Sequence, residues 1–272
     1  MCDKFYTKPA IAKKCVDILK THIELNGYSW IEPSAGSGSF IDAMSPNYVT
    51  GYDIAPDRSD ILKQDFLEFH PPDTTFRGRE TGVGIIGNPP YGPRSKLAIQ
   101  FINHAAIFAD VIAFVLPATF CRLNIQNKLD RRLQLIASVM LPSGSFIPRT
   151  TCKSVFQIFT KIETYTRPLV PLHRSTSDYT FVRRKIENIH DPSMVWFKAS
   201  CKGYGRVVNP DDIDIKKMWM YFCLKPEPGK FDLVVNNLNA FESEFVKYGK
   251  YSVSIPGLSQ QSLSMIYRSN VQ

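Results

Sequence analysis

The sequence of 272 residues lacks a run of apolar residues long enough to cross a membrane. A spanning helix needs about 18 such residues. The best candidate, residues 107–120, is shorter and contains Asp110 and Pro117. No apolar signal segment follows the first four residues either. We therefore expect an intracellular protein that does not enter a membrane.

Closely spaced metal-binding pairs are also missing. The six cysteines form no C-x-x-C pair and the five histidines form no H-x-x-x-H pair. These are spacings typical of metal and redox sites. We therefore expect no metal ion, and we expect reduced cysteines that serve as ordinary structural side chains.

With 44% hydrophobic and 21% charged residues, the composition is that of a folded protein and excludes a disordered chain. The net charge of +8 is unevenly distributed. Residues 1–150 contain 16 Lys and Arg against 14 Asp and Glu, and residues 151–272 contain 17 against 11. A basic C-terminal part fits a partner with a phosphate backbone.

Strand and helix patterns alternate along residues 1–165. We expect strands at residues 28–32, 48–54, 83–87, 111–116, 137–141 and 154–162, and helices at residues 9–20, 97–108 and 127–136. The strand at 111–116 is apolar throughout, which is typical of a parallel strand covered on both faces. The alternation predicts a doubly wound α/β domain.

The pattern changes after residue 165. Residues 166–171 contain two prolines and are expected to form a connector. Short strand-like segments at 179–182, 194–199 and 218–224 and a helix at 231–248 predict a small α+β domain. Trp196 and Trp219 are expected in its core.

The segment from Glu32 to the start of the next helix is Glu-Pro-Ser-Ala-Gly-Ser-Gly-Ser-Phe. Glycines between a strand and a helix allow a ligand to lie against bare backbone. Asp53 ends the next strand, where a carboxylate can accept hydrogen bonds from ribose hydroxyls, and Asp65 with Phe66 could hold an adenine. These features predict an adenosine-containing ligand. Ile41 stands where the third glycine of a dinucleotide motif would fall.

A second motif, Asn88-Pro89-Pro90-Tyr91, directly follows an apolar strand. An aromatic exocyclic amine is a poor nucleophile because its lone pair is delocalised into the ring. Two acceptors aimed at its hydrogens localise that lone pair. The Asn88 side-chain oxygen and the Pro89 carbonyl can be those acceptors, held rigid by the prolines. Tyr91 can stack on the ring.

Together these two motifs resemble those of amino-methyltransferases that use S-adenosyl-L-methionine, and most closely those of the N6-adenine DNA methyltransferases. The segment Phe5-Tyr6-Thr7-Lys8-Pro9 is similar to the part of that family that covers the methionine end of the cofactor. Its place before the glycine turn is similar to the gamma arrangement. The resemblance covers residues 1–165 and implies a Rossmann-like methyltransferase fold with a mixed, mainly parallel seven-stranded sheet. Residues 166–272 would form a small, basic α+β target-recognition domain.

The resemblance also implies roles for individual residues. The catalytic turn would be Asn88, Pro89, Pro90 and Tyr91. The cofactor would contact Tyr6, Thr7, Pro9, Glu32, Pro33, Ala35, Gly36, Gly38, Asp53, Ile54, Asp65, Phe66 and Asn88. The substrate would contact Tyr91, Phe146, Arg94, Lys96, Lys202 and Arg206, with Phe156 as a competitor of Phe146 for the second face of the base. Arg77 and Arg79 are expected in a loop near the pocket.

The activity implied is methyl transfer to the N6 amine of adenine in duplex DNA, at a specific short sequence and with the target base flipped out of the helix. Two alternatives stay open: the same transfer on RNA, and methylation of a glutamine amide in a protein. The basic C-terminal part favours a nucleic acid, and the two intact motifs argue against a non-catalytic binding protein. The sequence leaves open a homodimer and a cognate restriction endonuclease as partners.

Overall fold

The computed structural model describes residues 5–70, 82–148, 150, 152–164, 166–169, 176–251 and 257–271. The chain forms two compact units, Met1–Leu169 and Val170–Gln272. Arg77 and Arg79, predicted to lie in a loop near the site, fall outside the described residues. Within the described ranges no helix is both long and apolar enough to cross a bilayer.

The first unit is built on one seven-stranded sheet with the order β4-β3-β2-β5-β6-β9-β7. Its strands are β2 (Tyr28–Glu32), β3 (Val49–Asp53), β4 (Leu62–Lys63), β5 (Gly82–Gly87), β6 (Val111–Pro117), β7 (Leu133–Met140) and β9 (Ser154–Lys161). The strands from β4 to β6 pair in parallel, and β9 runs antiparallel to both β6 and β7. This confirms the mixed, mainly parallel sheet expected for a Rossmann-like methyltransferase fold.

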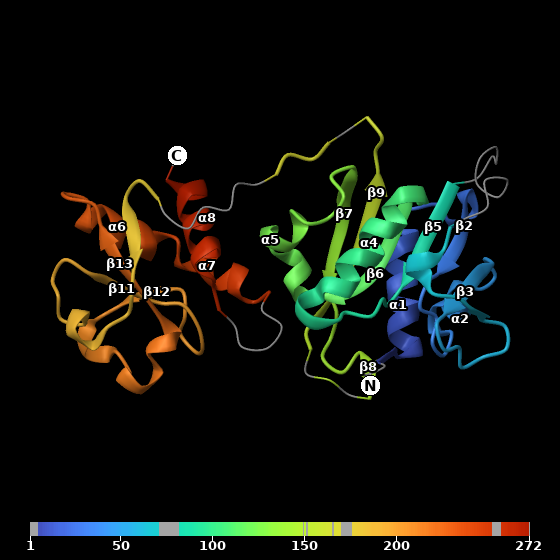
Figure 1. Ribbon diagram of the computed structural model, residues 1–272, viewed down its shortest axis with the longest axis horizontal. Coiled ribbons are helices and arrows are strands. Elements are labelled where there is room, and N and C mark those ends of the chain that lie inside the picture. The colour runs from blue at the N-terminus through green and yellow to red at the C-terminus, as the bar shows by residue number, and fades with distance from the viewer. Residues whose placement is uncertain are drawn as a thin grey trace. The chain divides into compact units, whose positions relative to one another are not determined.

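Helices cover both faces of this sheet (Figure 1). They are α1 (Pro9–Lys20), α2 (Ser39–Met44), α4 (Lys96–Phe108) and α5 (Leu123–Gln126). Side chains of α1 and α2 share an apolar core with Ile86 and Ala113, whereas side chains of α4 share the opposite core with Ile85 and Ile112. Because successive side chains of a strand point to opposite faces, the continuous apolar strands β5 and β6 supply both cores.

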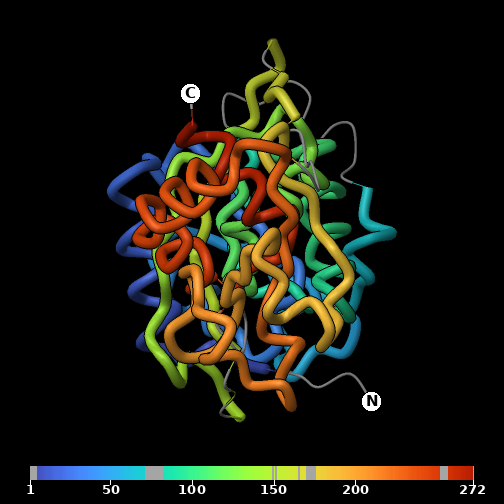
Figure 2. The backbone as a smooth tube through the Cα atoms, turned by 90° about the vertical axis from the view of Figure 1, so that its left-hand side faces the viewer, coloured from blue at the N-terminus to red at the C-terminus, as the bar shows by residue number. Residues whose placement is uncertain are grey.

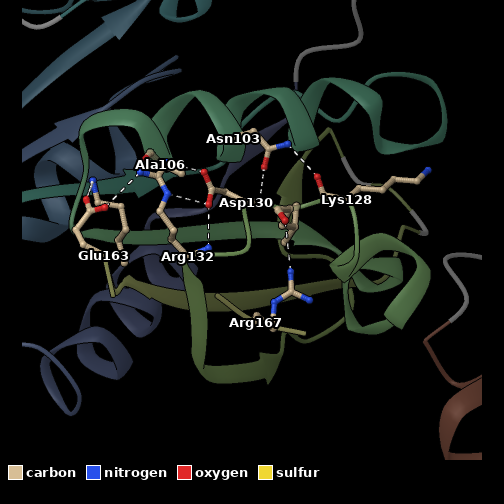
Figure 3. A network of polar contacts seen from close by, with 9 residues as sticks. Asn103, Ala106, Lys128, Asp130, Arg132, Glu163 and Arg167 are labelled. Atoms are coloured by element: carbon tan, nitrogen blue, oxygen red, sulfur yellow. Dashed lines mark hydrogen bonds and ion pairs between the residues drawn. The ribbon is translucent and has the colours of Figure 1, made fainter. Parts of the chain in front are cut away.

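The prediction of a helix at residues 127–136 is wrong. Asn103 of α4 accepts a hydrogen bond from the backbone of Asp130 and donates one to the carbonyl of Lys128, and Asp130 pairs with the side chain of Arg132 (Figure 3). These contacts hold the backbone in a turn. The following residues then extend as β7, which starts four residues before the strand expected at 137–141 and pairs with β9.

Short 3₁₀ helices join the larger elements of the chain. They are η1 (Leu25–Gly27), η2 (Phe66–Glu68), η3 (Pro93–Ser95), η4 (Ala118–Cys121), η5 (Ile186–Asn188), η6 (Pro210–Asp212) and η7 (Ile215–Met220). Two short strands, β1 (Tyr6–Thr7) and β8 (Phe146–Ile147), pair with each other outside the main sheet. That antiparallel pair ties the N-terminal segment to the first unit.

The second unit has a four-stranded antiparallel sheet of order β10-β13-β11-β12. Its strands are β10 (Tyr179–Val182), β11 (Val195–Lys198), β12 (Arg206–Val208) and β13 (Tyr221–Pro226). Its helices are α6 (Phe231–Ala240), α7 (Glu242–Gly249) and α8 (Gln260–Asn270). Side chains of all three helices join one apolar core with this sheet. Figure 2 shows the helices, coloured orange to red, gathered beside the strands.

Two expectations for the second unit are wrong. The single helix predicted at residues 231–248 is divided at Phe241 into α6 and α7, and Phe245 of α7 is fully buried. Trp219, expected in the core, is 55% exposed because it lies in η7 rather than in a strand. Trp196 on β11 is buried as expected.

Candidate active site

Two neighbouring strands bring the two predicted motifs together. β2 ends at Glu32, where the glycine turn begins, and β5 ends at Gly87, directly before Asn88. β2 and β5 pair in parallel, and the strand order along the chain reverses between them, because β3 and β4 lie on one side and β6 on the other. Ligands of open α/β sheets bind in the crevice at such a reversal.

A pocket lies at these strand ends, with about 260 Å³ of empty space when the open solvent at its mouth is included. Its lining consists of Phe5, Tyr6, Thr7, Glu32, Ser34, Ala35, Gly36, Ser37, Ser39, Phe40 and Asn88. Six of the predicted cofactor residues are among them: Tyr6, Thr7, Glu32, Ala35, Gly36 and Asn88. The other predicted cofactor residues do not line it: Pro9, Pro33, Gly38, Asp53, Ile54, Asp65 and Phe66.

The glycine turn needs glycine at two positions because its backbone has positive φ and close neighbours there. Gly36 has a φ of +51°, and a Cβ on it would lie 3.0 Å from the ring of Tyr6. Gly38 has a φ of +80°, and a Cβ on it would overlap the guanidinium group of Arg58. Larger residues would therefore both strain the backbone and displace these side chains.

Asp53 anchors the glycine turn to the neighbouring strand. Its Oδ2 accepts a hydrogen bond of 2.8 Å from the backbone of Gly36, and its Oδ1 accepts one of 2.8 Å from the backbone of Ala55. Each carboxylate oxygen can accept a further hydrogen bond. The adjacent Ile54 is 65% exposed, so an apolar side chain stands open beside a buried carboxylate.

Glu32 is a buried acid with one unpaired oxygen. It is 2% exposed, and its Oε2 is buried without a partner. Burial raises the pKa of Glu32 well above its usual range, and the negative charge of Asp53 raises it further. A buried polar atom without a partner is uncommon in folded proteins, so this oxygen fits a site for a polar ligand.

The N-terminal segment covers the glycine turn. Pairing of Thr7 with Phe146 holds the segment in place, and the hydroxyl of Tyr6 donates a hydrogen bond of 2.7 Å to Asp57. This hydrogen bond raises the pKa of Tyr6. The Oγ1 atom of Thr7 is buried and has no partner. Thr7 and Glu32 thus offer two unpaired polar atoms to one pocket.

Asn88 presents its side-chain oxygen as an unpaired acceptor. Its Nδ2 donates a hydrogen bond of 3.1 Å to the carbonyl of Phe5, while its Oδ1 is buried without a partner. The hydroxyl of Ser34 donates a hydrogen bond of 3.0 Å to the main-chain carbonyl of Asn88. The ring of Tyr91 is half-buried and its hydroxyl is enclosed, so burial raises the pKa of Tyr91.

Four aromatic and acidic residues from the predicted site lie elsewhere. Phe66 is buried against Phe101, with ring centroids 5.1 Å apart. Phe146 and Phe156 are buried in the core beneath α1. Asp65 accepts a hydrogen bond from the backbone two residues further on and so begins η2. The three phenylalanine rings are surrounded by core side chains. Their contact with an adenine ring, and that of Asp65, therefore stays a prediction.

The basic residues predicted to contact substrate are exposed. Arg94 and Lys96 come three and five residues after the Asn-Pro-Pro-Tyr motif, and Arg94 has a left-handed backbone with a φ of +53°. Lys202 and Arg206 are exposed in and after the turn that joins β11 to β12. Exposure permits a phosphate contact but does not distinguish it from an ordinary charged surface, so these roles stay predictions.

Sequence reasoning missed several residues that line the pocket. Phe5, Ser34, Ser37, Ser39 and Phe40 belong to the quoted motifs, but no pattern distinguishes them by function. Ser34 contacts a carbonyl 54 residues away. Such a contact follows from the pairing of β2 with β5 and leaves no local signal.

No protein-family model and no curated protein matches the sequence. Solved structures similar to this chain include a protein described as a modification subunit of a type I restriction enzyme from Vibrio vulnificus YJ016. Its TM-score is 0.45 and its sequence identity is 16%. The match covers 65% of this chain and 46% of that chain. The 23S rRNA methyltransferase ErmE gives a TM-score of 0.43 and 15% identity over 62% of this chain and 72% of that chain. Magnesium protoporphyrin IX methyltransferase from Synechocystis PCC 6803 gives a TM-score of 0.41 and 14% identity. The match covers 57% of this chain and 79% of that chain.

The chain spans less than half of the length of the Vibrio subunit. The descriptions of two of these proteins name different substrates, 23S rRNA and magnesium protoporphyrin IX. The ligand and substrate of this chain therefore have to be inferred from its own pocket.

Proposed function

We propose that this chain transfers a methyl group from S-adenosyl-L-methionine to the N6 amine of adenine in DNA. The observation that carries the proposal is the Oδ1 atom of Asn88, a buried acceptor without a partner at the end of β5. It lines the same pocket as the glycine turn at the end of β2. An acceptor beside a nucleotide-type turn suits a substrate that donates an N–H.

The pocket fits the proposed cofactor at its methionine end. Thr7 Oγ1 and Glu32 Oε2 are buried and unpaired, and they could accept hydrogen bonds from an amino group. Gly36 lines the pocket, so a ligand there would lie against backbone that carries no side chain. The carboxylate of Asp53 would accept hydrogen bonds from the ribose, and the exposed apolar side chain of Ile54 would contact the adenine.

When bound, this cofactor supplies an electrophilic methyl group on a positively charged sulphur. Asn88 Oδ1 and the Pro89 carbonyl would accept the two hydrogens of the target amine, which localises the lone pair on nitrogen. Neither oxygen is basic enough to keep a proton. The methyl carbon would pass to the nitrogen as its bond to sulphur breaks, which leaves a neutral thioether, and the nitrogen would then release its surplus proton to water.

The target base would stack on the exposed part of the Tyr91 ring. Stacking of a base on an aromatic side chain is worth on the order of 1–3 kcal/mol, which offsets part of the few kcal/mol needed to extrude a base from a duplex. Arg94 and Lys96 near the turn, and Lys202 and Arg206 in the second unit, would contact phosphates.

The proposal is tested with labelled S-adenosyl-L-methionine and three substrates: genomic DNA without adenine methylation, total RNA, and protein extract. We expect label in the N6-methyladenine of DNA. The variant Asn88→Ala should lose roughly 10²–10³-fold in turnover, as removal of one preorganised polar group does in other enzymes. Its affinity for the cofactor, measured by calorimetry, should change less than about threefold.

The control variant is Asn236→Ala, because Asn236 is an exposed residue on α6. It should keep full turnover. If label appeared only in RNA, or only in the glutamine of proteins, that molecule and not DNA would be the substrate. Failure of the wild-type protein to bind the cofactor would overturn the proposal as a whole.

A further inference from the structure

Asn88 is held from two sides by parts of the chain that are distant in sequence. Its Nδ2 donates to the carbonyl of Phe5 at 3.1 Å, and its main-chain carbonyl accepts from the hydroxyl of Ser34 at 3.0 Å. Phe5 precedes β1, whereas Ser34 lies in the glycine turn. The catalytic turn is therefore bonded to both segments that line the pocket.

The contact with Phe5 determines which end of the carboxamide faces the pocket. A main-chain carbonyl can only accept a hydrogen bond, so the nitrogen of the Asn88 side chain must face Phe5. A flipped carboxamide would place two oxygens against each other and lose this bond. The Oδ1 atom is thereby directed away from Phe5 and kept as an unpaired acceptor.

The contact with Ser34 holds the peptide group that joins Asn88 to Pro89. Proline has no backbone N–H, so this peptide group has no donor of its own. The hydroxyl of Ser34 restrains its oxygen, and with it the plane from which the side chain of Asn88 and the following residue Pro89 project. Ser34 thus connects the turn that would bind the cofactor to the turn that would bind the amine.

We propose that Ser34 is a positioning residue that couples the two turns, so that the acceptors at Asn88 and Pro89 are correctly placed only when the glycine turn is in place. This inference rests on the proposed function for its catalytic consequence. The coupling depends on the hydroxyl of Ser34, because this group donates the hydrogen bond to the carbonyl of Asn88.

The first test compares Ser34→Ala with Ser34→Thr, which retains the hydroxyl. Ser34→Ala should lower kcat about five- to tenfold, the effect expected from one neutral hydrogen bond. The KM and the calorimetric Kd for S-adenosyl-L-methionine should stay within twofold, and Ser34→Thr should recover most of the kcat. The matched control is Ser269→Ala, since the hydroxyl of Ser269 also donates to a main-chain carbonyl at 3.0 Å, on α8. It should leave kcat unchanged.

A second measurement does not depend on activity. In protein labelled with ¹³C at the asparagine main-chain carbonyls, the signal of Asn88 is identified by its loss in Asn88→Ala. That signal should shift in Ser34→Ala and return toward its original position in Ser34→Thr, because a carbonyl chemical shift responds to hydrogen bonding.

The outcomes separate the two proposals. An unchanged kcat in Ser34→Ala, or an equal loss in Ser34→Thr, overturns the role of Ser34. A wild-type protein that methylates no substrate overturns the proposed function. In that case the carbonyl signal decides whether Ser34 holds the turn: a shift supports the contact, and no shift overturns it.

Discussion

The backbone N–H of Gly36 donates a hydrogen bond of 2.8 Å to Oδ2 of Asp53, so the end of β3 holds the glycine turn that follows β2. The other oxygen of the same carboxylate accepts from Ala55. One carboxylate therefore satisfies two backbone donors from different segments. This arrangement requires two acceptor oxygens at the end of β3.

Replacing Asp53 by asparagine should lower the free energy of unfolding by about 1–3 kcal/mol, because the amide nitrogen would face one of the two backbone N–H groups and leave it unpaired. Urea denaturation measures this change. The control Asp17→Asn alters an exposed side chain on α1 and should change stability by less than about 0.5 kcal/mol. Equal stability of the two variants would show that Asp53 does not hold the turn.

Gly36→Ala should impair ligand binding more than stability. The left-handed backbone at this position costs about 1–2 kcal/mol for a residue with a Cβ, and the Cβ would press against the ring of Tyr6. Calorimetric titration with S-adenosyl-L-methionine should show at least tenfold weaker binding. Gly27→Ala is the control, because a Cβ there meets nothing within 4 Å. Equal binding by both variants would contradict the close approach of a ligand to Gly36.

The raised pKa of Glu32 predicts that binding of the positively charged cofactor becomes tighter as pH rises. Burial favours the neutral acid in the free protein, whereas a cation favours the ionised form. Binding should therefore release protons, and calorimetry in buffers of different ionisation enthalpy detects this release. In Glu32→Gln binding should be weaker and should lose this dependence on pH. An unchanged pH dependence in Glu32→Gln would assign the effect to another group.

The same pKa shift predicts the effect of pH on stability. The folded protein binds the proton of Glu32 more tightly than the unfolded chain does, so stability falls as pH rises above the ordinary carboxyl pKa. Glu32→Gln should remove this loss and make the unliganded protein more stable than the wild type at neutral pH. Urea denaturation at pH 5 and pH 8 provides the comparison. A less stable variant at pH 8 would contradict the burial of a neutral acid.

Lys230→Ala should destabilise the second unit by about 1 kcal/mol. Lys230 donates to Oδ1 of Asp178 at 2.7 Å, and the hydroxyl of Tyr267 donates to Oδ2 at 3.1 Å. The hydrogen bond from Lys230 lowers the pKa of Asp178 below its usual value. The stabilisation is therefore present above the ordinary carboxyl pKa and is lost as pH falls through the lowered value. Lys225→Ala, on an exposed position of β13, serves as the control in urea denaturation at pH 7 and pH 3.

Glycine and proline reveal special backbone geometry locally, so the two turns could be predicted from the sequence, and the resemblance to the N6-adenine DNA methyltransferases then supplied six residues that line the pocket. The prediction was wrong where distant contacts decide the local structure. The turn around Asp130 is an example, since Asn103 of α4 holds it and β9 then pairs with β7. The break near Phe241 is another, because burial of Phe245 depends on the whole second core.

Local sequence determined that β2 and β5 would be buried strands and that each would end in a special turn, because apolar composition and restricted φ angles act within a few residues. Only the tertiary structure decided which atoms stay unpaired. Glu32 Oε2 and Asn88 Oδ1 lack partners although parallel pairing of β2 and β5 brings both residues to one edge of the sheet, where the carbonyl of Phe5 accepts a hydrogen bond from the other end of the Asn88 carboxamide. Hydrogen-bond satisfaction depends on every neighbour in space, and the sequence lists neighbours only along the chain.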